Sequence, residues 1–369
     1  MVINRFSEHL NILVMPTDAC NMNCVYCFHT PSQALDEYMA LETVERLIAI
    51  AAPFYKKINF VWHGGEPLLM GLDFYKKVVA LQKSAVCRIR NSMQSNLTLM
   101  TEELAGFLCE NDFAISGSHD GVLNFKSRGR DEEILKGRQM IVSQGKKCGF
   151  VMVLSKLNIN SLMDSYNYFK KINANYSLNL HIDTNTSSNQ SLSLDETETV
   201  EKLNNFFAYW ARDPNCNINV SYFKHILDFI LMGKKTVCTY TSCLGRWIGV
   251  RYNGEVVPCN RKFPQEYSFG NIYDFANIGE AFESEGFERI LSEAIARREK
   301  CKACDIYAFC SGGCNHAAYY GNGIDGPETA NCRILKGVYT YIENYLAHTN
   351  VCKINNPILL DMLGKQIDA

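Results

Sequence analysis

Short β-rich runs alternate with amphipathic helical stretches along the first half of the chain, and this alternation limits the possible folds more than any other feature. The runs expected to form strands are residues 12–16, 58–62, 89–94, 113–116, 150–154 and 176–181. The clearest helical stretches are residues 41–52, 72–83 and 131–142. A strand followed by a helix, repeated six times, indicates parallel βα units, two short of a closed eight-fold barrel. We therefore expect an α/β fold with a partial (β/α)6 barrel over residues 1–185.

Three further parts are expected after the barrel. A segment rich in Ser, Thr and Asn, residues 184–197, is typical of a surface loop or domain boundary. Residues 186–237 are expected to form a helical bridge. Residues 238–345 combine short turns with many cysteines, and such a segment has little core of its own, so we expect bound metal to organise it. Residues 346–369 are expected to form a C-terminal tail.

Charge and hydropathy exclude several classes of protein. Lys and Arg number 37 against 39 Asp and Glu, without a long basic run, which argues against a nucleic-acid partner. An apolar run of 18 or more residues is absent from the sequence, which argues against a membrane partner, and charged residues occupy the place of a signal peptide's apolar stretch. We predict a cytoplasmic protein, in which 16 cysteines indicate metal binding or catalysis. A secreted disulfide scaffold is the alternative.

Three cysteines, Cys20, Cys24 and Cys27, follow the first expected strand with the spacing C-x3-C-x2-C. Barrel enzymes carry their chemistry on the loops at the C-terminal ends of strands. Three thiolates can hold three corners of a four-iron cluster, which leaves one iron open to bind a substrate or cofactor. A zinc site completed by His29 is the alternative for this motif.

A second group of cysteines begins with C-x2-C-x5-C-x3-C in residues 301–314. Three cysteines upstream and one downstream bring the group to eight, enough for two fully ligated four-iron clusters. Its members are Cys238, Cys243, Cys259, Cys301, Cys304, Cys310, Cys314 and Cys332. Two or more structural zinc ions are the alternative. The other five cysteines are expected to be ordinary thiols: Cys87, Cys109, Cys148, Cys216 and Cys352.

The first cysteine motif, with Tyr26 before Cys27, resembles that of the radical S-adenosylmethionine (SAM) enzymes. The resemblance implies that the open iron binds SAM and that its cleavage gives a 5′-deoxyadenosyl radical, which removes a hydrogen atom from the substrate. Further segments resemble family motifs: "GGEP", "QSN" and "SHDG", with Leu97 and His119 in place of a more usual Gly and Leu. The implied cofactor contacts are Tyr26, Gly64, Gly65, Glu66, Pro67, Gln94, Asn96, Ser118, Asp120 and Arg130.

The second group of cysteines resembles the SPASM extension of peptide-modifying radical SAM enzymes. The resemblance implies a first auxiliary cluster held by Cys238, Cys243, Cys259 and Cys314. It implies a second auxiliary cluster held by Cys301, Cys304, Cys310 and Cys332. The expected cofactors are therefore three [4Fe–4S] clusters and SAM.

Asn260 influences the choice between two groups of SPASM enzymes. In the anaerobic sulfatase-maturating enzymes, which make formylglycine, the resemblance places an Asp base at this position. A neutral amide does not accept a proton as a carboxylate does. We therefore predict a maturase that installs an intrapeptide cross-link, carbon–carbon or thioether, in a ribosomal precursor peptide. A reductase, flavodoxin or ferredoxin is the expected electron donor, and any leader peptide is expected to bind the barrel, the SPASM segment or a separate protein.

Two alternatives remain for the function. The first is an anaerobic sulfatase-maturating enzyme. The second, from another class, is an iron–sulfur protein that transfers electrons or senses redox state.

Overall fold

The computed structural model describes residues 8–28, 37–184, 192–349 and 354–367. The chain divides into two compact units that we describe separately. The first unit comprises Met1–Ser118, Arg130–Cys148 and Ser242–Ile295. The second comprises His119–Gly129, Gly149–Thr241 and Ala296–Ala369. Each unit therefore contains parts of both halves of the sequence.

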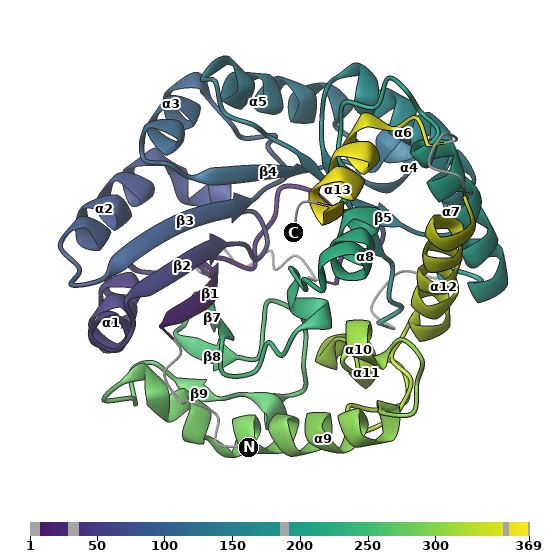
Figure 1. Cartoon of the computed structure of the whole chain (residues 1–369). Coiled ribbons are helices and arrows are strands. Elements are labelled where there is room, and N and C mark those ends of the chain that lie inside the picture. The colour runs from purple at the N-terminus through teal and green to yellow at the C-terminus, as the bar shows by residue number, and fades with distance from the viewer. Residues whose placement is uncertain (1–7, 29–36, 185–191, 350–353, 368–369) are drawn as a thin grey trace. The chain divides into compact units, whose positions relative to one another are not determined.

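A largely parallel sheet forms the centre of the first unit (Figure 1). Its strands are β1 (His9–Met15), β2 (Lys57–Trp62), β3 (Arg88–Gln94), β4 (Ala114–Ser118), β7 (Trp247–Arg251), β8 (Glu255–Val257) and β9 (Gly270–Asn271). They lie in the order β4-β3-β2-β1-β7-β8-β9, and only the β7–β8 and β8–β9 pairs are antiparallel. The parallel pairing places the C-terminal ends of β1 to β4 at one edge of the sheet.

Helices of the first unit pack along the strands, as Figure 1 shows for α1, α2, α3 and α5. The helices are α1 (Leu41–Ala51), α2 (Gly71–Lys83), α3 (Glu102–Glu110) and α5 (Asp131–Ser143), with the 3-10 turns η1 (Ala52–Phe54), η2 (Pro67–Met70), η6 (Gln265–Tyr267) and η7 (Ile278–Glu283). Helix α1 buries Val44, Leu47, Ile48 and Ala51, the spacing of one helical face. In the core, the Trp62 ring meets the Tyr75 ring edge-on at 5.4 Å between centroids.

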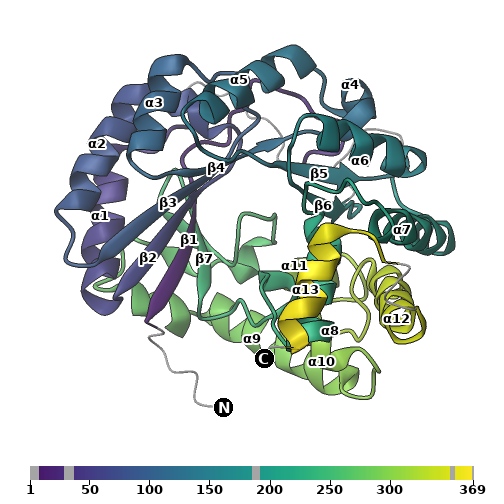
Figure 2. The same cartoon turned by 45° about the horizontal axis from the view of Figure 1, so that its top comes forward.

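The second unit contains the parallel pair β5 (Phe150–Leu154) and β6 (Tyr176–Leu180) together with most of the remaining helices. These are η3 (Gly121–Leu123), α4 (Asn124–Ser127), η4 (Ile159–Ser161), α6 (Leu162–Lys171), α7 (Glu196–Ala211), α8 (Ser221–Met232), η5 (Cys238–Tyr240), α10 (Tyr307–Cys310), α11 (Asn315–Tyr319), α12 (Cys332–His348) and α13 (Pro357–Ile367). Helices α7 and α12 lie side by side, and α8 contacts α12 and α13 (Figure 2). The buried rings of Phe206, Phe207, Trp210 and Phe223 join α7 to α8.

The six βα repeats confirm the expected α/β fold class. The observed strands begin or end within three residues of the predicted ones, and β5 matches its predicted range. The expectation of short turns and cysteines over residues 238–345 misses α9 (Glu285–Cys301), a helix of 17 residues. Its buried Phe287, Ile290, Ala294 and Arg297 have helical spacing, in which a charged residue interrupts the apolar pattern. Of the expected loop 184–197, residues 185–191 lie outside the described residues.

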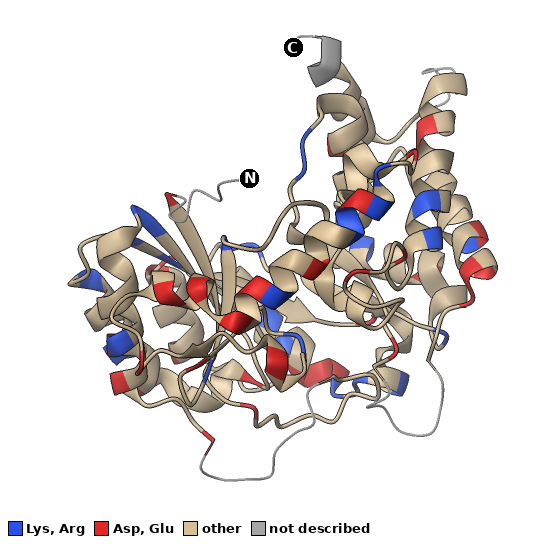
Figure 3. Ribbon diagram, turned by 90° about the horizontal axis from the view of Figure 1, so that it is seen from below, with Lys and Arg blue, Asp and Glu red and all other residues tan. Residues whose placement is uncertain are grey.

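Charged residues of both signs are interspersed along the elements seen in Figure 3. Within the described residues, we find no helix with the length and apolar character needed to cross a bilayer.

The backbone after β2 packs directly on the loop after β1. Gly65 N–H donates to the Thr17 carbonyl at 2.9 Å, and Glu66 N–H donates to the Ala19 carbonyl at 2.8 Å. A Cβ on Gly65 would lie 2.0 Å from the Ala19 carbonyl oxygen, and one on Gly64 would lie 2.6 Å from that of Thr17. Only glycine permits this approach, so the two glycines fix the start of the cysteine loop.

We predict that Gly65→Ala destabilises the apo-protein by about 1–3 kcal/mol, because the added methyl overlaps backbone that cannot rotate away. Gly106→Ala is the matched control, since Gly106 lies inside α3 with open space around its Cβ position. That change should be neutral or stabilise by up to about 1 kcal/mol. Thermal unfolding followed by circular dichroism measures both. Equal midpoints for the two variants would contradict the packing argument.

Candidate active site

The three cysteines of the first motif lie on the loop that follows β1. Their side chains are half-buried, and Cys27 N–H donates to the Cys24 carbonyl at 3.0 Å. Burial, with smaller contributions from nearby Glu66, Cys24 and Cys27, raises the pKa of the Cys20 thiol to about 12. The three thiols therefore lie close together in a partly buried place. A thiolate there needs a compensating positive charge, which bound iron supplies. The residues therefore fit a cluster held at three corners.

The zinc alternative for this motif gains no support. The described residues include no group of three or more His, Cys, Asp and Glu side chains placed to hold a single metal ion. Zinc draws its sulfur ligands to about 2.3 Å, whereas a four-iron cluster places each thiolate on a different iron. His29, the fourth ligand in the zinc alternative, lies outside the described residues.

The Glu66 side chain connects the end of β2 to the end of β3. One carboxylate oxygen accepts from Leu68 N–H at 2.9 Å and from the Ser95 hydroxyl at 2.8 Å. The other accepts from Asn96 N–H at 2.8 Å. Burial raises the pKa of Glu66 to about 7, against the lowering effect of these three hydrogen bonds. The carboxylate therefore holds "GGEP" and "QSN" at one edge of the sheet.

Asn96 extends this network to the cysteine loop. Its side-chain amide donates to Asn21 Oδ1 at 2.9 Å and lies 3.9 Å from Cys20 Sγ, while its Oδ1 accepts from Thr98. The following residue, Leu97, has φ 65° and is fully buried, so the positive φ is adopted without a glycine. Asn96 thus places an amide N–H beside one of the expected cluster ligands.

Gln94 and Ser118, at the ends of β3 and β4, bind each other. The Gln94 amide donates to Ser118 Oγ and to the Gly117 carbonyl, both at 2.8 Å, and its oxygen accepts from Ser116 Oγ. The first unit thus gathers most of the expected cofactor contacts at one edge. Half-buried Tyr26 lies on the cysteine loop itself.

Arg130 begins α5 from a left-handed backbone conformation, φ 56°. Its Nε lies 3.2 Å from a Glu133 carboxylate oxygen, and its side chain is 40% exposed. Its expected role as a SAM contact stays a prediction.

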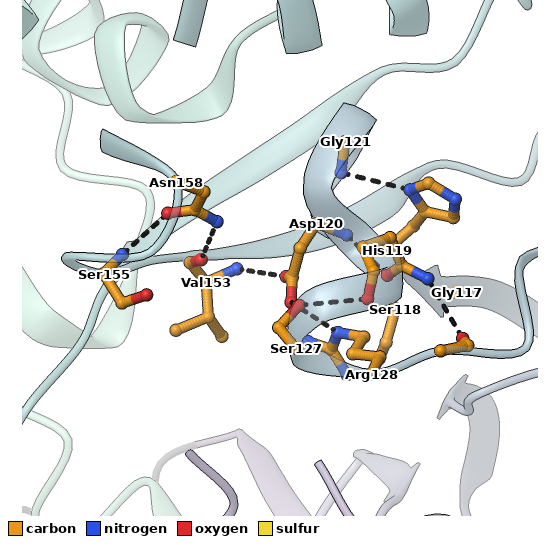
Figure 4. Close-up of polar contacts among 12 residues, drawn as sticks. Gly117, Ser118, His119, Asp120, Gly121, Ser127, Arg128, Val153, Ser155 and Asn158 are labelled. Atoms are coloured by element: carbon orange, nitrogen blue, oxygen red, sulfur yellow. Dashed lines mark hydrogen bonds and ion pairs between the residues drawn. The ribbon is translucent and has the colours of Figure 1, made fainter. Parts of the chain in front are cut away.

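Asp120, in the second unit, is enclosed by the chain's own donors (Figure 4). One carboxylate oxygen accepts from Val153 N–H at 2.9 Å, and the other accepts from Ser127 Oγ at 2.6 Å and pairs with Arg128 Nε at 3.2 Å. The carboxylate is fully buried, so these contacts attach the turn after "SHDG" to β5. They give Asp120 a structural role beside the expected cofactor contact, which stays a prediction.

His119 fills the position of the family's Leu inside an aromatic cluster. Its ring stacks on Tyr168 at 5.3 Å between centroids, and Nδ1 accepts from Gly121 N–H at 3.1 Å. The imidazole thus packs as an aromatic ring while also fixing the turn.

Four cysteines of the second group gather in the second unit. Cys301 ends α9, Cys310 ends α10 and Cys332 begins α12, with Cys304 in the turn between α9 and α10. Burial raises the pKa of Cys310 to about 11, and Cys332, Cys301 and Cys304 add to the shift. The four thiols therefore lie close together, as one cluster requires.

The other four cysteines of this group divide between the units. Cys243 and Cys259 belong to the first unit, and Cys238 and Cys314 belong to the second. Their assignment to one cluster stays a prediction. Of the five cysteines expected to be ordinary thiols, Cys109, Cys148 and Cys216 are buried and Cys87 is half-buried. Cys352 lies outside the described residues.

Asn260 follows Cys259 in the turn after β8 and is half-buried. The guanidinium of the next residue, Arg261, lies 4.8 Å from the centre of the Phe28 ring. Burial and the Arg261 charge lower the pKa of His63 to about 4, so that imidazole is neutral near pH 7.

Several residues of the site were missed in the sequence. Ser95, Asn21 and Thr98 lie inside or beside the recognised motifs, so their position in the sequence could have identified them. No sequence feature identifies Ser127 and Arg128, because only the fold of the turn brings them to the Asp120 carboxylate.

Two regions of the chain match known families. Residues 14–169 match the radical SAM superfamily, and residues 238–305 match the iron–sulfur cluster-binding domain called SPASM. The chain is 26% identical to the serine-type anaerobic sulfatase-maturating enzyme of Bacteroides thetaiotaomicron, over 94% of this chain and 92% of that enzyme. It is 26% identical to a cysteine-type anaerobic sulfatase-maturating enzyme of Clostridium perfringens, over 83% and 88%.

Solved structures agree with these matches. The chain resembles anSMEcpe with bound AdoMet, with a TM-score of 0.83, 25% identity and coverage of 96% of this chain and 98% of that one. The same enzyme with bound AdoMet and the Kp18Cys peptide gives a TM-score of 0.81 at 25% identity, over 97% and 99%. The expected [4Fe–4S] clusters and SAM are confirmed as the cofactors of these domains.

The predicted peptide cross-linking activity is wrong. Curated relatives matched along most of the chain include serine-type and cysteine-type anaerobic sulfatase-maturating enzymes, which were the alternative. The residue at one position, Asn260, therefore does not separate this chain from those enzymes. This chain therefore carries a radical SAM domain, matched over residues 14–169, followed by a SPASM domain, matched over residues 238–305.

Proposed function

We propose that this protein oxidises a Cys or Ser side chain of a peptide or protein substrate to formylglycine. The observation that carries the proposal is the whole-chain similarity to sulfatase-maturating enzymes of both the Ser and the Cys type. A structural neighbour that binds AdoMet together with a peptide supports a peptide substrate. The expected reductase, flavodoxin or ferredoxin remains a prediction.

When bound, SAM and the cluster at Cys20, Cys24 and Cys27 would supply a radical that takes a hydrogen atom from the substrate. The auxiliary clusters would accept the remaining electron. The chain's own residues hold the loops of this site together. Gly64 and Gly65 seat one strand end on the cysteine loop, and Glu66 joins it to the next strand end. Asn96 places an N–H beside Cys20.

Proton transfer is where this chain departs from the sulfatase enzymes. Oxidising the CH₂ group of a Cys or Ser removes a hydrogen atom, an electron and a proton. Ser gives the aldehyde directly, whereas Cys gives a thioaldehyde that water hydrolyses to the aldehyde with release of H₂S. Asn260 has no basic oxygen for that proton. The proton therefore leaves to water or to another group, and we expect this step to be slower than with a carboxylate at position 260.

The cysteine assignments predict the iron content. Anaerobically reconstituted protein should hold about twelve irons, from three four-iron clusters, and should absorb as a brown iron–sulfur protein. Iron and zinc analysis of the purified protein measures this. About four irons accompanied by zinc would contradict the assignment of the eight SPASM cysteines.

Replacing Cys20, Cys24 and Cys27 together with Ala should leave about eight irons and abolish formation of 5′-deoxyadenosine from SAM under reducing conditions. Chromatography of the reaction measures the nucleoside. Cys87→Ala is the matched control, because Cys87 lies outside both cysteine groups and should leave both readouts unchanged. Cleavage of SAM by the triple variant would place the reactive cluster elsewhere. Absence of cleavage by the unsubstituted protein would favour the electron-transfer alternative.

The proposed reaction predicts an aldehyde on a sulfatase-type peptide that carries a Cys or Ser target. Mass spectrometry after hydrazide capture detects it. Asn260→Asp should raise the rate, by at most the 10²- to 10⁴-fold that a positioned base typically contributes. Asn253→Asp adds the same charge at an exposed position of the β7–β8 turn and should leave the rate unchanged. Absence of aldehyde with both the parent and Asn260→Asp would refute the proposal.

A further inference from the structure

A fully buried arginine lies against the loop between Cys310 and Cys314. Arg297, on α9, has no exposed surface. Its Nε donates to the Gly312 carbonyl at 2.8 Å, and its two terminal nitrogens donate to the Ile324 carbonyl and to Asn315 Oδ1, the latter at 2.6 Å. The nitrogen that donates to Asn315 also lies 3.4 Å from the Gly313 carbonyl oxygen. The guanidinium therefore joins α9 to two carbonyls of the loop that separates Cys310 from Cys314, and to two residues that follow this loop.

The loop adopts a backbone conformation that needs such support. Ser311, Gly312 and Gly313 have consecutive positive φ values of 54°, 84° and 72°. Serine rarely occupies this region, so the surroundings must hold it there. The Lys235 ammonium also hydrogen-bonds to Ser311 Oγ. These contacts fix the spacing between Cys310 and Cys314.

The charge of Arg297 lies close to the expected cluster ligands. Cys301 is four residues further along the same helix, so both project from one face. Burial raises the pKa of the Cys301 thiol, and the Arg297 charge opposes that shift. Removing a guanidinium from water is unfavourable unless negative charge or strong acceptors compensate it. A four-iron cluster with four thiolate ligands carries net negative charge, which would provide this compensation.

We propose that Arg297 is a positioning residue for the cluster assigned to Cys301, Cys304, Cys310 and Cys332, and that its buried charge raises the reduction potential of that cluster. Reduction adds negative charge to an already negative group, so a nearby cation shielded from water favours the reduced form. The inference rests on the assignment of these four cysteines and is independent of formylglycine formation.

The test is a redox titration of the full chain, followed by electron paramagnetic resonance, with Cys20, Cys24 and Cys27 replaced by Ala so that only auxiliary clusters contribute. In this background, Arg297→Gln should shift an auxiliary midpoint potential to a more negative value. Arg297→Lys keeps the charge but loses the forked hydrogen bonds, so its shift should be smaller than that of Gln but measurable.

Lys302→Gln is the matched control in the same background. It removes one positive charge next to Cys301, but the Lys302 side chain is 58% exposed and pairs with Glu299 at 2.6 Å. Solvent screens such a charge, so we expect little shift.

Full iron content with no greater shift in Arg297→Gln than in Lys302→Gln would overturn the proposal. If Arg297→Gln does not fold or does not take up iron, Arg297→Met, which also removes the charge, decides. A negative shift, or selective loss of about four irons, supports the role of Arg297. Unchanged iron and unchanged potentials in Arg297→Met overturn it. Fewer than about eight irons in the parent background would instead show that the cluster assignment has failed.

Discussion

The contact between the Gly64–Gly65 backbone and the Thr17–Ala19 backbone is the constraint on which the candidate site depends. Parallel pairing of β1 and β2 brings both loops to one edge of the sheet, and the absence of side chains lets the two backbones touch. From there, Glu66 reaches the next strand end and Asn96 returns to Cys20. A continuous path of contacts therefore links the cysteine loop, which follows β1, to the ends of β2 and β3.

Buried charges hold the structure around the sites. Glu66 and Asp120 each accept hydrogen bonds at both carboxylate oxygens, and Arg297 is surrounded by carbonyl and amide oxygens. A buried charge without partners would be strongly destabilising, whereas one that collects several backbone groups makes loop geometry specific. Glu66, Asp120 and Arg297 each join a loop or turn that carries a recognised motif to a neighbouring part of the fold.

Asn260 stands where the resemblance to sulfatase-maturating enzymes implies an Asp, and this difference alone does not define the function. Asn260 changes the chemistry available at one step, because an amide does not accept a proton as a carboxylate does. This difference affects the rate of proton removal from the substrate. Similarity to a serine-type anaerobic sulfatase-maturating enzyme extends over 94% of the chain, far beyond this one position. The two observations are compatible if Asn260 slows or redirects a proton in the same overall reaction.

The sequence by itself determined the six βα repeats and both groups of cysteines, because hydrophobic period and ligand spacing are local properties that survive without a structure. It also located "GGEP" and "QSN" at strand ends. Only the tertiary structure decided the partners of Glu66, Asp120 and Arg297, since each binds residues brought close by folding. It also revealed α9 as a long helix, whose apolar face is interrupted by the arginine that reaches the cysteine loop. A buried charge looks like a surface residue in a sequence until the oxygen atoms that enclose it are known.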